Sequence, residues 1–148
     1  MDINLGEWKL IKTGHIEADF EGFNDEMIFE FSDGTVYIQS AYKYKYHYAY
    51  HPIAKIYTDG NLQIIVPEGM DDFAEVITTN SIKSKIISDF NGWSGDTLFE
   101  LQNGQIWRQS QYQYKYFYAY RPDVLIIKSG NYHIMRVNGK QIRVIRVK

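Results

Sequence analysis

The chain contains no cysteine, and this absence removes several classes of chemistry at once. Disulfide bonds, thiolate metal sites and a cysteine nucleophile are excluded, and nothing in the sequence favours an oxidising compartment. The sequence also lacks the apolar run of about 18 residues that a membrane span needs. Residues 1–12 show no basic segment followed by an apolar run, so we expect no signal peptide and a soluble, cytoplasmic protein.

Helical periodicity and the common catalytic motifs are missing as well. There is no glycine-rich phosphate loop, no HExxH and no CxxC. His47 and His51 would lie about 13 Å apart along a strand, too far to share one metal ion. Ser40, Glu30 and Asp19 recur 70 residues later, but no histidine accompanies the serine in both places, and edge acids also discourage strand addition. We therefore expect a non-catalytic protein with no cofactor and no metal.

What the sequence does have is tyrosine at every second position, in two places. The first stretch ends at Pro52 and the second at Pro122. A period of two is that of a β-strand, and tyrosine is a strong strand former, so the rings of each stretch should share one face. We call them row 1 and row 2; their members are Tyr42, Tyr44, Tyr46, Tyr48 and Tyr50 in row 1, and Tyr112, Tyr114, Tyr116, Tyr118 and Tyr120 in row 2.

The rows belong to a longer internal repeat. A shift of 70 residues superposes residues 20–52 on 90–122 without a gap, and 15 of these 33 positions are identical. Beyond the prolines the match thins but keeps its frame, so that Gly60 meets Gly130 and Gly69 meets Gly139. We interpret this as a tandem duplication. It predicts a first domain over 15–79 and a second over 80–148, preceded by a strand or arm over 1–14.

The local signals predict an all-β fold. Asn103-Gly104 and Asn138-Gly139 stand between alternating segments, which is typical of hairpins. Residues 35–50 read as one long strand with a bend near Gln39, where polar and small residues interrupt the pattern. About five or six short strands in each copy of about 65 residues indicate two tandem SH3-like small β-barrels, related by a pseudo-two-fold axis.

Several of these motifs together carry a resemblance. Residues 89–93, residues 98–107, row 2 and Val137-Asn138-Gly139 resemble a short repeat of many uncharacterised bacterial proteins. The first copy departs from it, since Phe23 and Tyr37 stand where the second has Trp93 and Trp107. The resemblance implies a bacterial origin and the small-barrel fold, and it implies no activity and no catalytic residues.

The function that we expect depends on whether the tyrosine rings are buried or exposed. Five alternating residues span more length than so small a barrel can bury. The rings therefore either divide between the core and an interface of the two copies or form an exposed aromatic platform, unless the strand itself is assigned wrongly. The opposite face, in which Lys45 and Lys115 are common to both copies, reads as a solvated polar face or as the cationic side of a nucleic-acid groove.

Charge is distributed unevenly along the chain. Residues 1–70 carry five lysines and eleven acids, and residues 71–148 carry eleven cations and seven acids, so the halves have net charges of −6 and +4. Such halves attract each other within one chain or across a homodimer, or the second meets an anionic partner.

We therefore predict a binding module for a protein or peptide segment, held in an aromatic groove. The first alternative is nucleic-acid binding through Lys45, Lys115, Arg108 and Arg121 with stacking tyrosines. The second alternative is carbohydrate binding. The candidate ligand-binding residues are Phe23, Tyr37, Trp93, Trp107, Tyr44, Tyr46, Tyr114, Tyr116, Lys45 and Lys115.

Overall fold

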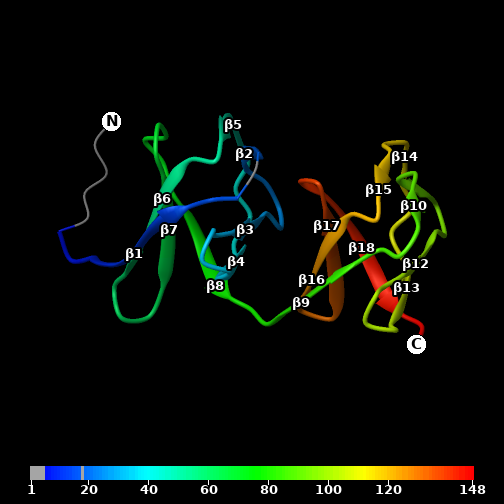
Figure 1. Ribbon diagram of the computed structural model, residues 1–148. Helices are drawn as coiled ribbons and strands as arrows, with labels where there is room; N and C mark the ends of the chain where they lie inside the picture. The colour runs from blue at the N-terminus through cyan, green and yellow to red at the C-terminus, as the bar shows by residue number, and fades with distance from the viewer. Residues whose placement is uncertain (1–5, 18) are drawn as a thin grey trace. The chain divides into compact units, whose positions relative to one another are not determined.

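The computed structural model describes residues 6–17 and 19–148, and its regular structure consists of β-strands (Figure 1). The all-β class predicted from the sequence is confirmed. The chain forms two compact units, Met1–Thr79 and Asn80–Lys148, which we call unit 1 and unit 2. Within the described part of the chain, no helix is long and apolar enough to cross a membrane.

The described residues of unit 1 form eight strands. Six of them form one antiparallel sheet in the order β1-β6-β7-β8-β4-β3, and β2 pairs with β5 beside it. The segment expected as a strand or arm supplies β1, although its residues 1–5 lie outside the described residues. The strands are β1 (Lys9–His15), β2 (Asp19–Phe23), β3 (Ile28–Glu30), β4 (Val36–Gln39), β5 (Lys45–Tyr50), β6 (Ile53–Thr58), β7 (Gln63–Pro67) and β8 (Ala74–Thr78).

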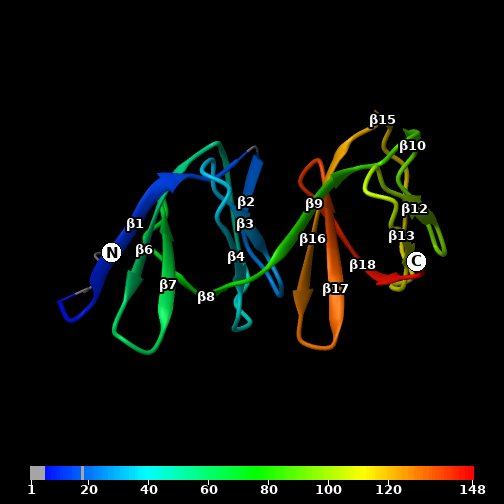
Figure 2. The ribbon, with the colours of Figure 1, turned by 60° about the horizontal axis from the view of Figure 1, so that its bottom comes forward.

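Unit 2 follows the same plan with ten strands (Figure 2). Its six-stranded sheet has the order β9-β16-β17-β18-β13-β12, which matches the order in unit 1 strand for strand along the chain. We call the β2–β5 pair of unit 1, and its counterpart in unit 2, the ribbon. In unit 2 the ribbon is divided into two short ladders, β10 with β15 and β11 with β14. The strands are β9 (Ser81–Lys85), β10 (Asp89–Phe90), β11 (Trp93–Ser94), β12 (Leu98–Glu100), β13 (Ile106–Gln109), β14 (Tyr114–Lys115), β15 (Ala119–Tyr120), β16 (Asp123–Ser129), β17 (Tyr132–Val137) and β18 (Lys140–Arg146).

The units differ in one connection. The predicted Asn138-Gly139 turn joins β17 to β18, and both residues have positive φ, as such two-residue hairpins require. In unit 1, residues 68–73 join β7 to β8 instead. Gln63 therefore pairs with Val76, while His133 pairs with Val144, so the shift between the units falls from 70 to 68 after this turn. The longer loop brings two aspartates that unit 2 lacks at this place.

Each unit has its own aromatic core between its six-stranded sheet and its ribbon. In unit 1 the rings of Phe20, Phe23 and Phe29 lie about 6 Å apart by their centroids and meet at steep or tilted angles, the arrangement that aromatic pairs prefer. In unit 2, Phe90 meets Trp93 and Phe99 in the same way. Each ribbon thus packs on its core through the strands that pair with the tyrosine-bearing ones. These are β2 in unit 1 and β10 and β11 in unit 2.

Candidate binding surface

All ten rings of the two rows are exposed. Their exposed fractions run from 53% at Tyr48 to 86% at Tyr112, and none of the ten belongs to either core. The expectation that some of these rings enter a core is therefore wrong, and the rows have the exposure that an aromatic platform needs. Ten exposed tyrosines on a chain of 148 residues are far more than scattered surface apolar groups explain.

The opposite side of each ribbon faces the core, and this explains why the tyrosines point outward. Ala49 in unit 1, and Ala119 and Phe117 in unit 2, are partly buried and pack on the core clusters. Phe117 meets the rings of Phe90 and Trp93 edge to face, with centroids 4.9 and 5.0 Å away. Because successive strand residues alternate between faces, packing the alanines inward turns the tyrosines to solvent. The polar-face interpretation of this side was wrong at these three positions.

A glycine of the neighbouring segment lies against the backbone of each row. Gly22 pairs with Tyr46, and Gly22 and Gly92 have φ of +96° and +90°. A Cβ built at either residue would lie about 2 Å from a carbonyl oxygen, that of Lys45 in unit 1 (2.1 Å) and that of Lys115 in unit 2 (1.9 Å). Only glycine lets the ribbon backbone approach its neighbour so closely.

A buried glutamine holds the loop that begins each row. Gln39 and Gln109 are each 3% exposed. The Nε2 of Gln109 donates to the carbonyls of Gln111 and Gln113, and its Oε1 accepts from the N–H of Gly95. Gln39 makes the same two donations, to Ala41 and Lys43, and accepts from Asn24. The bend predicted near Gln39 is present, and it separates β4 from β5 in place of one continuous strand.

One tyrosine of each row is tied to the ribbon. The hydroxyl of Tyr48 donates to Asp19, at 2.8 Å, and that of Tyr118 donates to Asp89, at 3.1 Å. Because the carboxylate accepts the phenolic proton, this hydrogen bond raises the pKa of both tyrosines above the ordinary value. The recurring Asp19/Asp89 pair thus orients a ring in each row.

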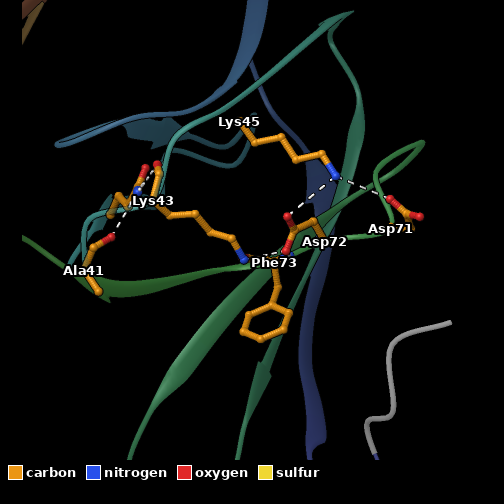
Figure 3. Close-up of polar contacts among 7 residues, drawn as sticks. Ala41, Lys43, Lys45, Asp71, Asp72 and Phe73 are labelled. Carbon is orange, nitrogen blue, oxygen red and sulfur yellow. Dashed lines mark hydrogen bonds and ion pairs between the residues drawn. The ribbon is translucent and has the colours of Figure 1, made fainter. Parts of the chain in front are cut away.

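Row 1 has a further anchor, formed by an ion-pair cluster (Figure 3). The ammonium of Lys43 donates to the carboxylate of Asp72 and to the carbonyl of Phe73, and it lies 4.6 Å from the centroid of the Phe73 ring. Lys45 lies 3.5 Å from Asp71 and 3.6 Å from Asp72. The cluster joins the start of row 1 to the loop between β7 and β8. In unit 2, Gln113 replaces Lys43, and the two-residue turn carries no acid.

The Lys43→Gln substitution, which gives unit 1 the residue of unit 2, should show how much this cluster stabilises. Burial raises the pKa of Asp72, but hydrogen bonds from Lys43 and from the N–H of Phe73 outweigh it and lower the pKa below the usual 3.8. A lowered folded pKa stabilises the fold above the unfolded value and loses that contribution as the pH falls through the folded value. We expect Lys43→Gln to cost about 1 kcal/mol at pH 7 and less below about pH 4.

Urea unfolding at pH 7 and pH 3, monitored by amide hydrogen exchange of unit 1, measures this difference in stability. Lys55→Gln is the matched control, because Lys55 is an exposed lysine of the same unit that lies outside the cluster. A cost of Lys43→Gln that does not change with pH would contradict the role given to Asp72.

The predicted site residues separate into two groups. Tyr44, Tyr46, Tyr114, Tyr116, Lys45 and Lys115 lie on the exposed ribbons. Phe23, Tyr37, Trp93 and Trp107 are core side chains, each at most 5% exposed, so they lie outside the exposed ribbons. Aromatic character does not distinguish a core ring from a surface ring. The signal that sequence reasoning missed is the alanine that both copies place between the last two tyrosines of the row, Ala49 and Ala119, which marks the inward face.

The division into units sharpens the charge asymmetry. Unit 1 carries five lysines and fourteen acids, and unit 2 carries eleven lysines and arginines and four acids, so their formal net charges are −9 and +7. The ion-pair cluster offsets the cations of row 1. In unit 2, Lys115 is exposed and forms no ion pair with any described residue, and Arg121 lies over the ring of its neighbour Tyr120. The two rows therefore offer similar rings in different electrostatic surroundings.

A groove of about 480 Å³ lies in unit 2 beside row 2. Its lining combines β12, residues 88–94 and residues 114–116, which include Tyr114 and Tyr116. Trp93 also lines it, and the buried indole Nε1 of this residue has no hydrogen-bond partner among the described residues. The volume is within the range of ligand-binding pockets, about 300 to 1,000 Å³.

These features define the chain as an all-β protein of two units, each displaying an exposed tyrosine ribbon. No protein-family model, curated protein or solved structure matches it. Within residues 6–17 and 19–148, no group of three or more His, Asp or Glu side chains is arranged to hold a metal ion.

Proposed function

We propose that the chain is a non-catalytic binding module that holds a protein or peptide segment on its tyrosine rows. The exposure of all ten rings supports this most directly. Tyrosine offers a large apolar contact area together with a hydrogen-bonding hydroxyl, and it orders at a low entropic cost, which is why it is enriched at protein-binding surfaces. Each unit is proposed to be an SH3-like small barrel, on the basis of its size, its antiparallel pairing and the strand order shared by both units.

Electrostatics favours this proposal over nucleic-acid binding for row 1. A nucleic-acid groove needs cations that are available to phosphates. Lys43 and Lys45 are engaged with Asp71 and Asp72, and unit 1 as a whole is acidic. Row 2 has available cations, so an oligonucleotide belongs in the test as a competing ligand.

Selection from a random peptide library displayed on phage tests the proposal. The full chain should enrich peptides that bind it, and the paired substitutions Tyr44→Ser/Tyr46→Ser or Tyr114→Ser/Tyr116→Ser should weaken that binding at least tenfold, because buried interface aromatics each contribute on the order of 1–2 kcal/mol. Leu62→Ser is the matched control, because Leu62 is 47% exposed and belongs to the turn between β6 and β7, not to either row.

Binding of a poly(dT) oligonucleotide, titrated at two salt concentrations, is the second arm. Tight, strongly salt-dependent oligonucleotide binding that depends on Lys115, with no peptide enrichment, would replace this proposal by nucleic-acid binding. Peptide binding that survives both tyrosine pairs would remove the rows from the site.

A further inference from the structure

Strand β12 is the last strand in the order of the unit 2 sheet (Figure 1). Its residues also line the groove beside row 2. It pairs with β13 on one side, with Leu98 opposite Arg108, Phe99 opposite Trp107 and Glu100 opposite Ile106. On its other side no further strand of the sheet follows within the described residues, but Ile86 forms an isolated bridge with Leu101, just beyond the end of β12. The backbone groups of a sheet edge can pair with an incoming strand, and here they are open only at the start of β12.

The hydrogen bonds at the two ends of β12 show which backbone groups face the groove side. The carbonyl of Thr97 accepts from Gln109 of β13, whereas the carbonyl of Glu100 accepts from the N–H of Ile87, on the opposite side. In an antiparallel ladder, alternate residues direct both backbone groups to the same side. Leu98, two residues before Glu100, therefore directs its N–H and C=O away from β13, where they meet no described backbone partner.

The groove is acidic in a basic unit. Its charged lining residues are Asp89, Glu100 and Lys115, a net charge of −1, whereas unit 2 as a whole has +7. Glu100 is exposed and forms no ion pair with any described residue. Tyr114 and Tyr116 are among the residues that line the groove, and both are exposed. A carboxylate beside exposed aromatic rings suits a guanidinium or ammonium group, which gains from both.

We propose that this groove takes an extended peptide segment that adds to the edge of β12 and places a lysine or arginine side chain beside Glu100. Backbone pairing with Leu98 supplies the register, and Tyr114 and Tyr116 cover the segment from the ribbon side. The inference rests on the proposed function, since it names the site and the chemistry of the segment that row 2 binds. In unit 1 the matching edge strand is β3. Its surroundings differ, because an aspartate-containing loop and two lysines ion-paired to it lie at the ribbon.

The test uses the peptides that the full wild-type chain enriches from the library. They should be rich in lysine or arginine. Leu98→Pro, which removes the outward N–H, should weaken their binding at least tenfold, whereas Leu98→Thr, which keeps it, should leave the affinity within twofold. Glu100→Gln should weaken binding several-fold, and Glu68→Gln, at an exposed acid of unit 1, should not.

A second measurement applies if Leu98→Pro does not fold. Methylating the amide nitrogens of the peptide one at a time should weaken binding most at the one position whose N–H pairs with the carbonyl of Leu98, as strand addition requires. Wild-type affinity in folded Leu98→Pro, or equal tolerance of methylation at every position, overturns the groove assignment while tyrosine-dependent peptide binding still supports the proposed function. If the wild-type chain enriches no peptide, both are overturned.

Discussion

Replacing Gly92 by alanine is expected to destabilise unit 2 by about 3–4 kcal/mol, enough to unfold a marginal domain. Two effects add at this residue. Its φ of +90° is unfavourable for any side chain, and the new Cβ would lie 1.9 Å from the carbonyl oxygen of Lys115. That oxygen belongs to the ribbon backbone and moves only if β14 moves with it. Because row 2 is carried on the same backbone, the surviving folded molecules should display it differently.

Gly104→Ala separates the two effects. Gly104 also has a φ of +90°, but a Cβ there would meet no atom within 4 Å. This variant should therefore lose only the conformational part, about 1 kcal/mol. Urea unfolding monitored by tryptophan fluorescence measures the stability loss of both variants, since Trp93 and Trp107 are buried in unit 2. Equal losses in the two variants would show that the close approach to Lys115 contributes nothing.

Replacing Gln109 by leucine should cost about 2–3 kcal/mol, although the two side chains have similar volumes. The change removes three hydrogen bonds and leaves the carbonyls of Gln111 and Gln113 and the N–H of Gly95 without their partner. Since Gln109 is 3% exposed, water does not replace the amide without rearrangement. Residues 111–113, which carry Tyr112, should lose their fixed conformation.

Gln113→Leu is the control for this substitution, because Gln113 is an exposed side chain of the same loop and contributes its backbone carbonyl to the network. It should change the stability by no more than about 0.5 kcal/mol. The measurements are urea unfolding for stability and amide hydrogen exchange for the loop. Rapid exchange of the Gly95 amide, which donates to the side chain of Gln109, is the expected result in Gln109→Leu, with slow exchange retained in Gln113→Leu. Unchanged exchange in both would show that the loop is held by other contacts.

The predictable parts of the fold are those that local chemistry decides. Alternation of residues and Asn-Gly turns gave the all-β class, and Asn138-Gly139 adopts the positive φ values expected of it. The break after Gln39 was also predictable, but its cause was not. The side chain that holds the bend is Gln39, whose amide donates to two carbonyls at once.

The candidate site was harder, because it depends on which face of a strand is buried. A period of two places the tyrosines together but does not say whether they face the core or water. Size and hydrophobicity favoured burying some of the rings, yet Ala49 and Ala119 take the inward positions, where the ribbon lies close to the core. The glycines at 22 and 92 reveal this close approach only once the neighbouring carbonyl is placed.

The residues of each ribbon differ in how strongly a substitution affects folding, depending on which face of the ribbon they occupy. Substitutions at Ala49, Gly22 or Gln39 are felt by the whole unit, whereas an exposed ring such as Tyr50 can change with little effect on folding. Outward positions of this kind are therefore free to change while the scaffold stays constant. The two units already differ in their surroundings, since their formal net charges are −9 and +7.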